Sequence, residues 1–179
     1  SPTWLNEMLT HLQEGGYAAL QSSLRALQPT NFWSKGWDVY FQESIRPTPN
    51  TKMVGHPSIY LTKALLGARS DIGHEHEDTQ LSIDFQQRGL RQGIAPVASY
   101  RIAPDSGRES IQKWRGYGRG YRGLVSNQPD KRGAILRHIA WTIPFVRGWR
   151  PVKRGHITQP LFAGIMTASI GYGFLFPQR

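Results

Sequence analysis

The chain has 179 residues and a mass of 20.3 kDa, and its 39% apolar and 11% aromatic content exclude a disordered tail. It contains no cysteine, which excludes disulfides, cysteine-ligated metal sites and a cysteine nucleophile. The net charge is +10, and residues 108–154 hold twelve Lys and Arg against two Asp and Glu. This basic block favours an anionic partner, such as nucleotide, lipid or nucleic-acid phosphates, over a merely solvated surface.

The first quarter of the chain predicts a helix followed by a strand. Ser1 and Pro2 suit a helix start, and the first residues of the sequence show no signal-peptide pattern. Five apolar residues then fall on one helical face, namely Trp4, Leu5, Met8, Leu9 and Leu12. Gly15-Gly16 ends this helix, and residues 17–27 alternate as a strand does. Residues 31–37 form an aromatic, turn-rich segment, and Val39-Tyr40-Phe41 follows it.

The middle of the chain contains shorter elements. Residues 58–66 form an apolar element closed by Gly67. From Asp78 to Arg88 the alternation favours a strand, whereas Gln-Gln-Arg followed by Gly89 is typical of a helix end. Residues 94–102 predict a second strand, interrupted by Pro96.

The last third predicts helices. Residues 110–125 suit a basic helix interrupted by glycines, and residues 132–146 are apolar with basic edges. Residues 160–176 carry no charge. A helix of that length spans about 25 Å, and a bilayer core needs about 30 Å. The segment therefore suits a borderline spanning helix, an interfacial helix or a buried core helix.

Two clusters carry chemistry. In the sequence His74-Glu-His-Glu-Asp78, the residues His74 and His76 with nearby carboxylates could hold a divalent metal, and the alternative is a solvated polar loop. Glu77-Asp78 offers a different role, because a carboxylate at a loop-to-element junction can accept a proton from an attacking hydroxyl. His156 is a further, weaker metal candidate between the basic block and the uncharged segment.

The second cluster is the segment 112–122. Arg115, Arg119 and Arg122 share one face of a helix, and arginine binds phosphate oxygens in a bidentate manner. The glycines at 116, 118 and 120 would let a backbone or a ligand approach closely. The same mix of basic and aromatic residues could also describe an RNA-binding segment.

Taken in order, these segments resemble the acceptor-side half of an inverting family 2 glycosyltransferase of the GT-A fold. Residues 1–9 resemble the helix after that family's Asp-x-Asp strand, and residues 55–65 resemble the segment before its acceptor site. Glu77-Asp-Thr-Gln-Leu matches the family's Glu-Asp-x-x-Leu motif, and residues 89–96 resemble the strand that follows it. Residues 112–122 resemble the family's helix of arginine, tyrosine and glycine, although Trp114 and Arg115 are swapped relative to the Gln-x-x-Arg-Trp of processive synthases.

The resemblance implies a fold, a mechanism and a set of site residues. The fold would be α/β, the second half of a Rossmann-like GT-A domain with short strands, and residues 78–88 would be a helix. Asp78 would be the general base and Glu77 would support it. The donor diphosphate would be bound by four residues, namely Gln112, Trp114, Arg115 and Arg119. A divalent metal, Mg or Mn, is the implied cofactor, although the Asp-x-Asp that would hold it is absent from this sequence.

The resemblance also implies partners. These are a nucleotide sugar, a saccharide or lipid-linked acceptor, and an upstream half or partner chain that carries the Asp-x-Asp. Residues 1–127 would form the acceptor-side half-domain. Residues 128–179 would form a helical region at the cytoplasmic face of a membrane, peripheral or with one apolar helix, because basic residues precede the uncharged segment. The alternatives are a non-catalytic scaffold subunit of a membrane-associated complex and, less favoured, a nucleic-acid-binding module.

Overall fold

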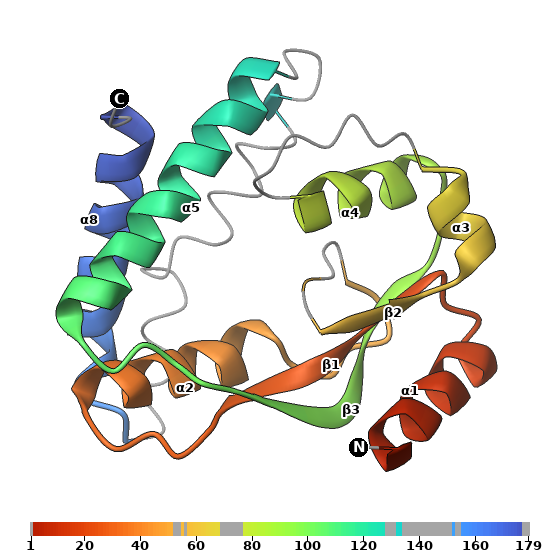
Figure 1. Ribbon diagram of the computed structural model, residues 1–179, viewed down its shortest axis with the longest axis horizontal. Helices are drawn as coiled ribbons and strands as arrows, with labels where there is room; N and C mark the ends of the chain where they lie inside the picture. The colour runs from red at the N-terminus through yellow and green to blue at the C-terminus, as the bar shows by residue number, and fades with distance from the viewer. Residues whose placement is uncertain are drawn as a thin grey trace. The chain divides into compact units, whose positions relative to one another are not determined.

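Figure 1 shows the computed structural model of the chain, which describes residues 2–51, 55, 57–68, 77–127, 132–133, 152 and 155–176. Within these residues the chain is a mixed α/β protein with six helices and one sheet of three short strands. The α/β class expected from the sequence is therefore confirmed.

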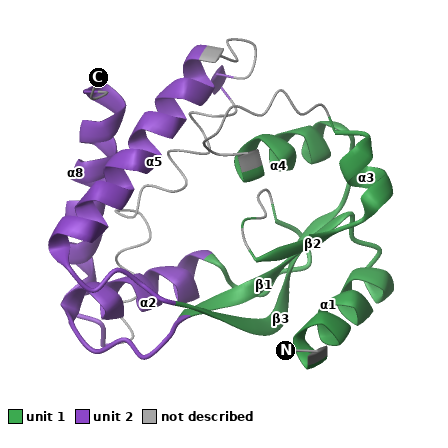
Figure 2. Cartoon of the chain, in the orientation of Figure 1, with its two compact units in different colours: residues 1–25, 45–101 green, residues 26–44, 102–179 purple. Residues whose placement is uncertain are grey.

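The chain divides into two compact units, which have different colours in Figure 2. The first unit comprises residues 1–25 and 45–101, and the second comprises residues 26–44 and 102–179. The boundary expected after residue 127 lies inside the second unit. The helix that ends there belongs with the C-terminal helix rather than with the sheet.

The sheet of the first unit has β1 (Ala19–Ala26) at its centre, β2 (Ser58–Tyr60) on one side and β3 (Gln92–Arg101) on the other. β1 and β2 are antiparallel, with residues 19–21 opposite residues 58–60 in reverse order. The strand predicted over residues 17–27 is therefore confirmed as β1.

Contacts between β1 and β3 advance in the same direction along both strands. The Ala18 N–H donates to the Arg91 carbonyl at 2.8 Å, and further on the Ser23 hydroxyl donates to the Val97 carbonyl at 3.1 Å. The sheet is therefore mixed. β3 runs without interruption through Pro96, which is tolerated because β3 is an edge strand among the strands described.

Helices cover both faces of this sheet. α1 (Pro2–Glu14) lies on one face, while α3 (Thr62–Leu66) and α4 (Glu77–Gln87) lie on the other, as Figure 1 shows. Successive β1 residues point to opposite faces, so Leu20 packs under α1 and Ala19 packs under α4. The two buried clusters are Met8, Leu12, Leu20, Ala95 and Val97, and Ala18, Ala19, Ala64 and Phe85.

Two helices of the first unit test the sequence predictions. α1 forms as expected, but Leu5 and Leu9 are 46% and 39% exposed, so its buried stripe is narrower than predicted. α4 confirms the helix implied by the resemblance over residues 78–88, against the alternation. It ends before Gly89, whose φ of 67° closes the turn.

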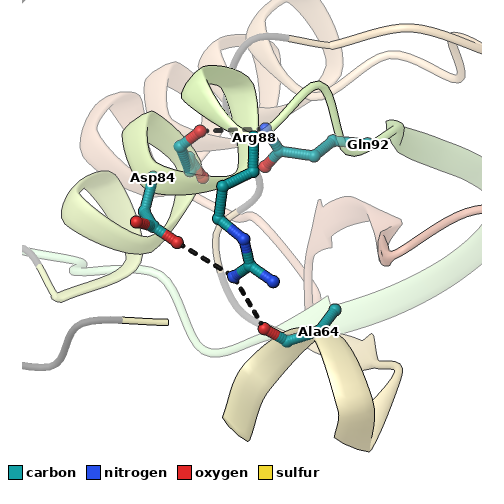
Figure 3. A network of polar contacts seen from close by, with 5 residues as sticks. Ala64, Asp84, Arg88 and Gln92 are labelled. Carbon is teal, nitrogen blue, oxygen red and sulfur yellow. Dashed lines mark hydrogen bonds and ion pairs between the residues drawn. The ribbon is translucent and has the colours of Figure 1, made fainter. Parts of the chain in front are cut away.

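Arg88 connects the end of α4 to α3, as Figure 3 shows. One guanidinium nitrogen donates to Asp84 Oδ2 at 3.1 Å and to the Ala64 carbonyl at 3.0 Å. Nearby, the buried Gln92 side chain donates to the Ser82 carbonyl at 3.0 Å, which joins β3 to α4. These contacts fix α4 against its neighbours at the end opposite to Glu77.

The second unit contains α2 (Phe32–Ser44), α5 (Gly107–Asn127) and α8 (Gln159–Leu175). α2 replaces the turn-rich segment predicted over residues 31–37, and that prediction was wrong. Asn31 caps the helix: its Oδ1 accepts from the N–H groups of Trp33 and Ser34 at 2.9 and 3.0 Å. The Ser34 hydroxyl accepts in return from the Asn31 N–H at 3.2 Å, as in a capping box.

An aromatic core holds the three helices of the second unit together. Trp37 of α2 stacks on Trp114 of α5 with ring centroids 5.2 Å apart, and Phe162 of α8 meets Trp114 edge-on at 5.0 Å. All three rings are buried. The Trp37 Nε1–H donates to the Ser110 hydroxyl at 3.1 Å, which satisfies that polar group inside the core.

α5 and α8 lie side by side (Figure 1), and glycine residues allow their backbones to approach closely. A Cβ at Gly118 would overlap the Ile170 carbonyl and lie 2.7 Å from the Phe174 nitrogen, and a Cβ at Gly173 would lie 2.8 Å from the Arg115 Cα. Gly118 of α5 therefore admits a backbone, which is one of the two possibilities predicted for the glycines at 116, 118 and 120.

α8 confirms a helix over the uncharged segment, and its buried residues pack within the second unit. Among the helices described, none combines the length and hydropathy needed to cross a membrane. The predicted element at residues 132–146 lies outside the described residues, apart from Arg132 and Gly133. The basic residues that precede the uncharged segment also lie outside them, namely Arg147, Arg150, Lys153 and Arg154.

Candidate functional site

The predicted base, Asp78, lies in the first turn of α4 and is half-buried. Its Oδ1 accepts a hydrogen bond from the Thr79 N–H at 2.7 Å. That N–H is one of those that a helix start leaves without an intrahelical partner, so the contact both satisfies it and orients the carboxylate. Thr79 itself is only 1% exposed, so the helix start is anchored in the core. Glu77 is the first residue of the same helix.

The other carboxylate oxygen of Asp78 faces the backbone of Gly55. Asp78 Oδ2 lies 3.4 Å from the position that a Cβ at Gly55 would take. The two atoms of the Gln21 side-chain amide lie 3.7 and 3.8 Å from the same position. A side chain at Gly55 would therefore be in ordinary van der Waals contact with both Asp78 and Gln21, so the two polar side chains lie next to the same backbone position. We call these three residues the Asp78 site.

β1 holds the segment at residues 55–58 in place. The Gly55 N–H donates to Gln21 Oε1 at 2.8 Å, and the Ser22 N–H donates to the Pro57 carbonyl at 3.2 Å. The Ser58 hydroxyl closes the segment by donating to the Gly55 carbonyl. Since Gln21 and Ser22 are buried strand residues, the backbone next to Asp78 is held by a rigid strand.

Sequence reasoning missed Gln21. It is a polar residue in a predicted strand, and such residues usually face solvent. Its side chain is 3% exposed because helices cover both faces of β1. The available signal for a buried polar residue was the run Gln-Ser-Ser at positions 21–23, which directly follows Ala-Ala-Leu in the predicted strand. A buried amide has to be satisfied, which often happens next to a loop or a ligand.

The predicted diphosphate-binding residues lie on α5 in the second unit and differ in their surroundings. Arg115 places its guanidinium 4.3 Å from the ring centroid of Tyr172 in α8. Arg122 donates to the carbonyls of Phe174 and Leu175 at 3.3 and 3.1 Å, where it satisfies the C-terminal end of α8. Arg119 is half-buried and makes no hydrogen bond or ion pair with the part of the chain that the structure describes.

Gln112 and Trp114 lie on different sides of α5. Gln112 is exposed, whereas Trp114 is fully buried against Trp37 and Phe162. The Trp114 Nε1 has no hydrogen-bond partner among the described residues. Trp114 thus packs inside the second unit, and Gln112 presents its amide to solvent.

The residues described do not fit a divalent metal. Within the described ranges, no three His, Asp or Glu side chains converge. His156 is exposed and belongs to no such group, while His74 and His76 lie outside the described residues. Asp78 alone is not a ligand set for Mg²⁺ or Mn²⁺, which take several oxygen ligands. The mechanism proposed for Asp78 therefore contains no metal-dependent step.

Comparison of the chain with protein-family models, with curated proteins and with solved structures gives no match. Its function therefore has to be argued from the residues and their geometry.

Proposed function

We propose that this chain supplies the acceptor side of an inverting glycosyl transfer from a nucleotide sugar, with Asp78 as the general base. The observation that carries the proposal is that the two oxygens of the Asp78 carboxylate have different surroundings. Oδ1 is held by the helix start, and Oδ2 lies outside that contact, next to Gly55. A base needs both properties, because it must be oriented and must reach a substrate proton. The order of motifs along the chain adds the resemblance to the second half of a GT-A domain.

The proposed step is a single displacement. Asp78 accepts the proton of an acceptor hydroxyl, and the hydroxyl oxygen forms a bond to the anomeric carbon of the donor sugar. The bond from that carbon to the diphosphate breaks, and the nucleoside diphosphate leaves with the electron pair. The configuration at the anomeric carbon inverts because attack and departure are on opposite faces. Glu77 would support the base from the preceding position.

Charge on the leaving diphosphate would be neutralised by arginine. Arg119 is the most available of the predicted arginines, because its guanidinium is not engaged by described residues, while Arg115 already lies against Tyr172. Gln112 is exposed and can contribute a hydrogen bond. The nucleotide-binding part, with the Asp-x-Asp that this sequence lacks, would come from an upstream half or a partner chain.

We further propose a peripheral location at a membrane surface for this activity. The C-terminal end of α8 exposes Tyr172, Leu175 and Phe176 by 42%, 64% and 59%. Arg122 lies against the last carbonyls of the same helix. Exposed apolar side chains beside arginine suit an interface with anionic lipid. A lipid-linked acceptor would be presented at such a surface.

A second candidate function is that of a non-catalytic scaffold. The observation in its favour is that Arg115 and Arg122, two of the three arginines on the α5 face, contact α8. Under this alternative, the basic helix is used for packing and the Asp78 site is inherited without use.

The experiment that separates the two is the replacement Asp78→Asn in the native assembly, assayed for transfer from nucleotide sugars. Asparagine keeps the shape and can still accept the Thr79 N–H, but it cannot take a proton. We expect kcat to fall by about 10²–10⁴-fold, with the free energy of unfolding little changed. Asp105→Asn is the matched control, since Asp105 is exposed and lies outside the Asp78 site. Transfer that survives Asp78→Asn removes Asp78 as the base.

A further inference from the structure

One side of α8 exposes apolar side chains from its first turn to its end. Five exposed residues lie along this side, namely Leu161, Ala168, Tyr172, Leu175 and Phe176. Their spacing matches the helical repeat, so they share one face, which is about 21 Å long from Leu161 to Leu175. Residues 160–176 contain no charged residue. We call these five residues the α8 stripe.

The other side of α8 is already used for packing. Phe162 and Met166 are 1% and 2% exposed, and Phe162 meets the Trp114 ring edge-on at 5.0 Å. A helix that packs one side on a core usually carries polar residues on its outer side. α8 instead leaves Leu161 and Leu175 62% and 64% exposed near the two ends of the stripe. A continuous exposed apolar surface of this kind marks a contact with a membrane or another molecule.

The charge around the α8 stripe selects what covers it. The second unit, which contains α8, holds fourteen Lys and Arg against five Asp and Glu, whereas the first unit holds eight against seven. Two of these arginines adjoin the stripe. The Arg115 guanidinium lies 4.3 Å from the centroid of the Tyr172 ring, and Arg122 donates to the Leu175 carbonyl at 3.1 Å.

This charge favours an anionic lipid surface over a second copy of the chain. A second copy would bring the same excess of positive charge to the contact, and the two copies would repel each other. An anionic bilayer supplies acyl chains for the apolar side chains and phosphates for the arginines beside them.

We propose that α8 lies along the surface of an anionic bilayer, with the α8 stripe among the acyl chains and Arg115 and Arg122 at the level of the headgroups. The inference rests on the peripheral location in the proposed function, which needs only the C-terminal end of α8. It goes further by adding Leu161 and Ala168 to the contact. The axis of the helix is then parallel to the membrane surface.

The test uses the full 179-residue chain, which has no cysteine of its own, so that single cysteines can carry an environment-sensitive fluorophore. The labelled variants are Leu161→Cys, Ala168→Cys and Leu175→Cys, and the control is Leu66→Cys, at an exposed leucine of the first unit. The vesicles contain equal amounts of phosphatidylglycerol and phosphatidylcholine. We expect the emission of all three stripe labels to shift to the blue and to be quenched by nitroxide-labelled lipid, while the control label does not respond.

Three results would overturn the inference. A response at Leu175→Cys alone would mean that only the end of α8 inserts, which leaves the peripheral location standing. Stripe labels that report apolar surroundings before vesicles are added would mean that another part of the chain or a second copy covers the stripe. No response at any of the three positions would remove the membrane location as well.

A matched pair of variants tests whether the middle of the stripe enters the lipid. Ala168→Glu places a carboxylate there and should weaken vesicle binding about tenfold, because the charge is desolvated and repelled by the anionic surface. Ala98→Glu makes the same change at an exposed alanine of β3 and should leave vesicle binding nearly unchanged. Equal losses in the two variants would mean that net charge alone sets the affinity, and the flat orientation would be wrong.

The catalytic role of Asp78 is tested separately. Asp78→Asn leaves the α8 stripe intact, so it should bind vesicles as the unmodified chain does while losing transfer. If transfer depends on Asp78 but the stripe labels do not respond to vesicles, the catalytic proposal stands and the orientation of α8 falls. If the labels respond but Asp78→Asn still supports transfer, the membrane contact stands and the role of Asp78 falls.

Discussion

The contact between α5 and α8 makes a sharp prediction at Gly118. A Cβ there would overlap the Ile170 carbonyl and lie 2.7 Å from the Phe174 nitrogen, and both are backbone atoms that cannot rotate away. For Gly118→Ala the two helices must move apart. Overpacking of this kind costs about 1–3 kcal/mol, whereas alanine gains up to about 1 kcal/mol over glycine inside a helix. We expect a net loss of about 1–2 kcal/mol in the free energy of unfolding.

Gly123 in the same helix supplies the matched control. A Cβ at Gly123 would meet nothing within 4 Å, so Gly123→Ala keeps the helix-propensity gain and should raise the free energy of unfolding by up to about 1 kcal/mol. Urea titrations followed by tryptophan fluorescence and by far-UV circular dichroism would measure both variants, since Trp114 reports on the core next to this contact. If Gly118→Ala is as stable as Gly123→Ala, the close packing of α5 on α8 is wrong.

Three further outcomes are expected. Asn31→Ala should lower the free energy of unfolding by about 1 kcal/mol, measured in the same titrations, because two N–H groups of α2 lose their cap; an unchanged midpoint would contradict the capping box. Arg119→Gln should weaken nucleotide-sugar use in the transfer assay without changing the free energy of unfolding. Arg122→Gln should instead lower the free energy of unfolding by about 1 kcal/mol, because α8 loses its terminal contacts. The reverse pattern would assign the phosphate role to Arg122. Leu175→Ser should reduce co-sedimentation with phosphatidylglycerol vesicles about fivefold, because about 1 kcal/mol of apolar transfer free energy is lost. The control is Leu66→Ser, which alters an 82% exposed leucine on α3 and should leave co-sedimentation unchanged.

Most elements of the fold were accessible from the sequence because their signals were local. α1 and α4 each end at a glycine that adopts positive φ, Gly16 and Gly89, and such glycines are strong signals of helix ends. α4 is instructive, since alternation favoured a strand and the motif resemblance favoured a helix. The helix prevailed, because α4 packs one side on the sheet through Phe85 and its capped end is anchored by Thr79.

The error at residues 31–37 has a clear physical origin. Asn, Ser and Gly within an aromatic segment favour turns when they are considered one at a time. In the structure Asn31 and Ser34 form a capping box, and Gly36 faces the Phe162 ring, where a Cβ would clash with it. The polar residues therefore start the helix, and the glycine serves packing against α8. Only the contact across more than a hundred residues reveals the second role.

The sequence predicts the proposed base, Asp78, but not the residues that surround it. Asp78 stood out because its motif places a carboxylate at the start of an element. Gln21 lies 57 residues earlier in the chain, and Gly55 lies between the two, so their convergence depends on the order of strands β2, β1 and β3. No local pattern encodes that order. For the same reason the burial of Trp114, which the resemblance placed among ligand-binding residues, depends on α2 and α8.

The basic helix shows how a charge count overstates the surface that is free to bind an anion. Arg115 contacts the Tyr172 ring of α8, and Arg122 donates to carbonyl oxygens of α8. A ligand phosphate that binds either arginine would have to replace these contacts. Arg119 makes no such contact with the residues that the structure describes. A phosphate bound at α5 therefore gains most from Arg119, and its affinity should depend on that one residue more steeply than the three-arginine pattern predicts. The glycines that bring α8 close are what create this difference, because they place the carbonyls and the Tyr172 ring within reach of the outer two arginines.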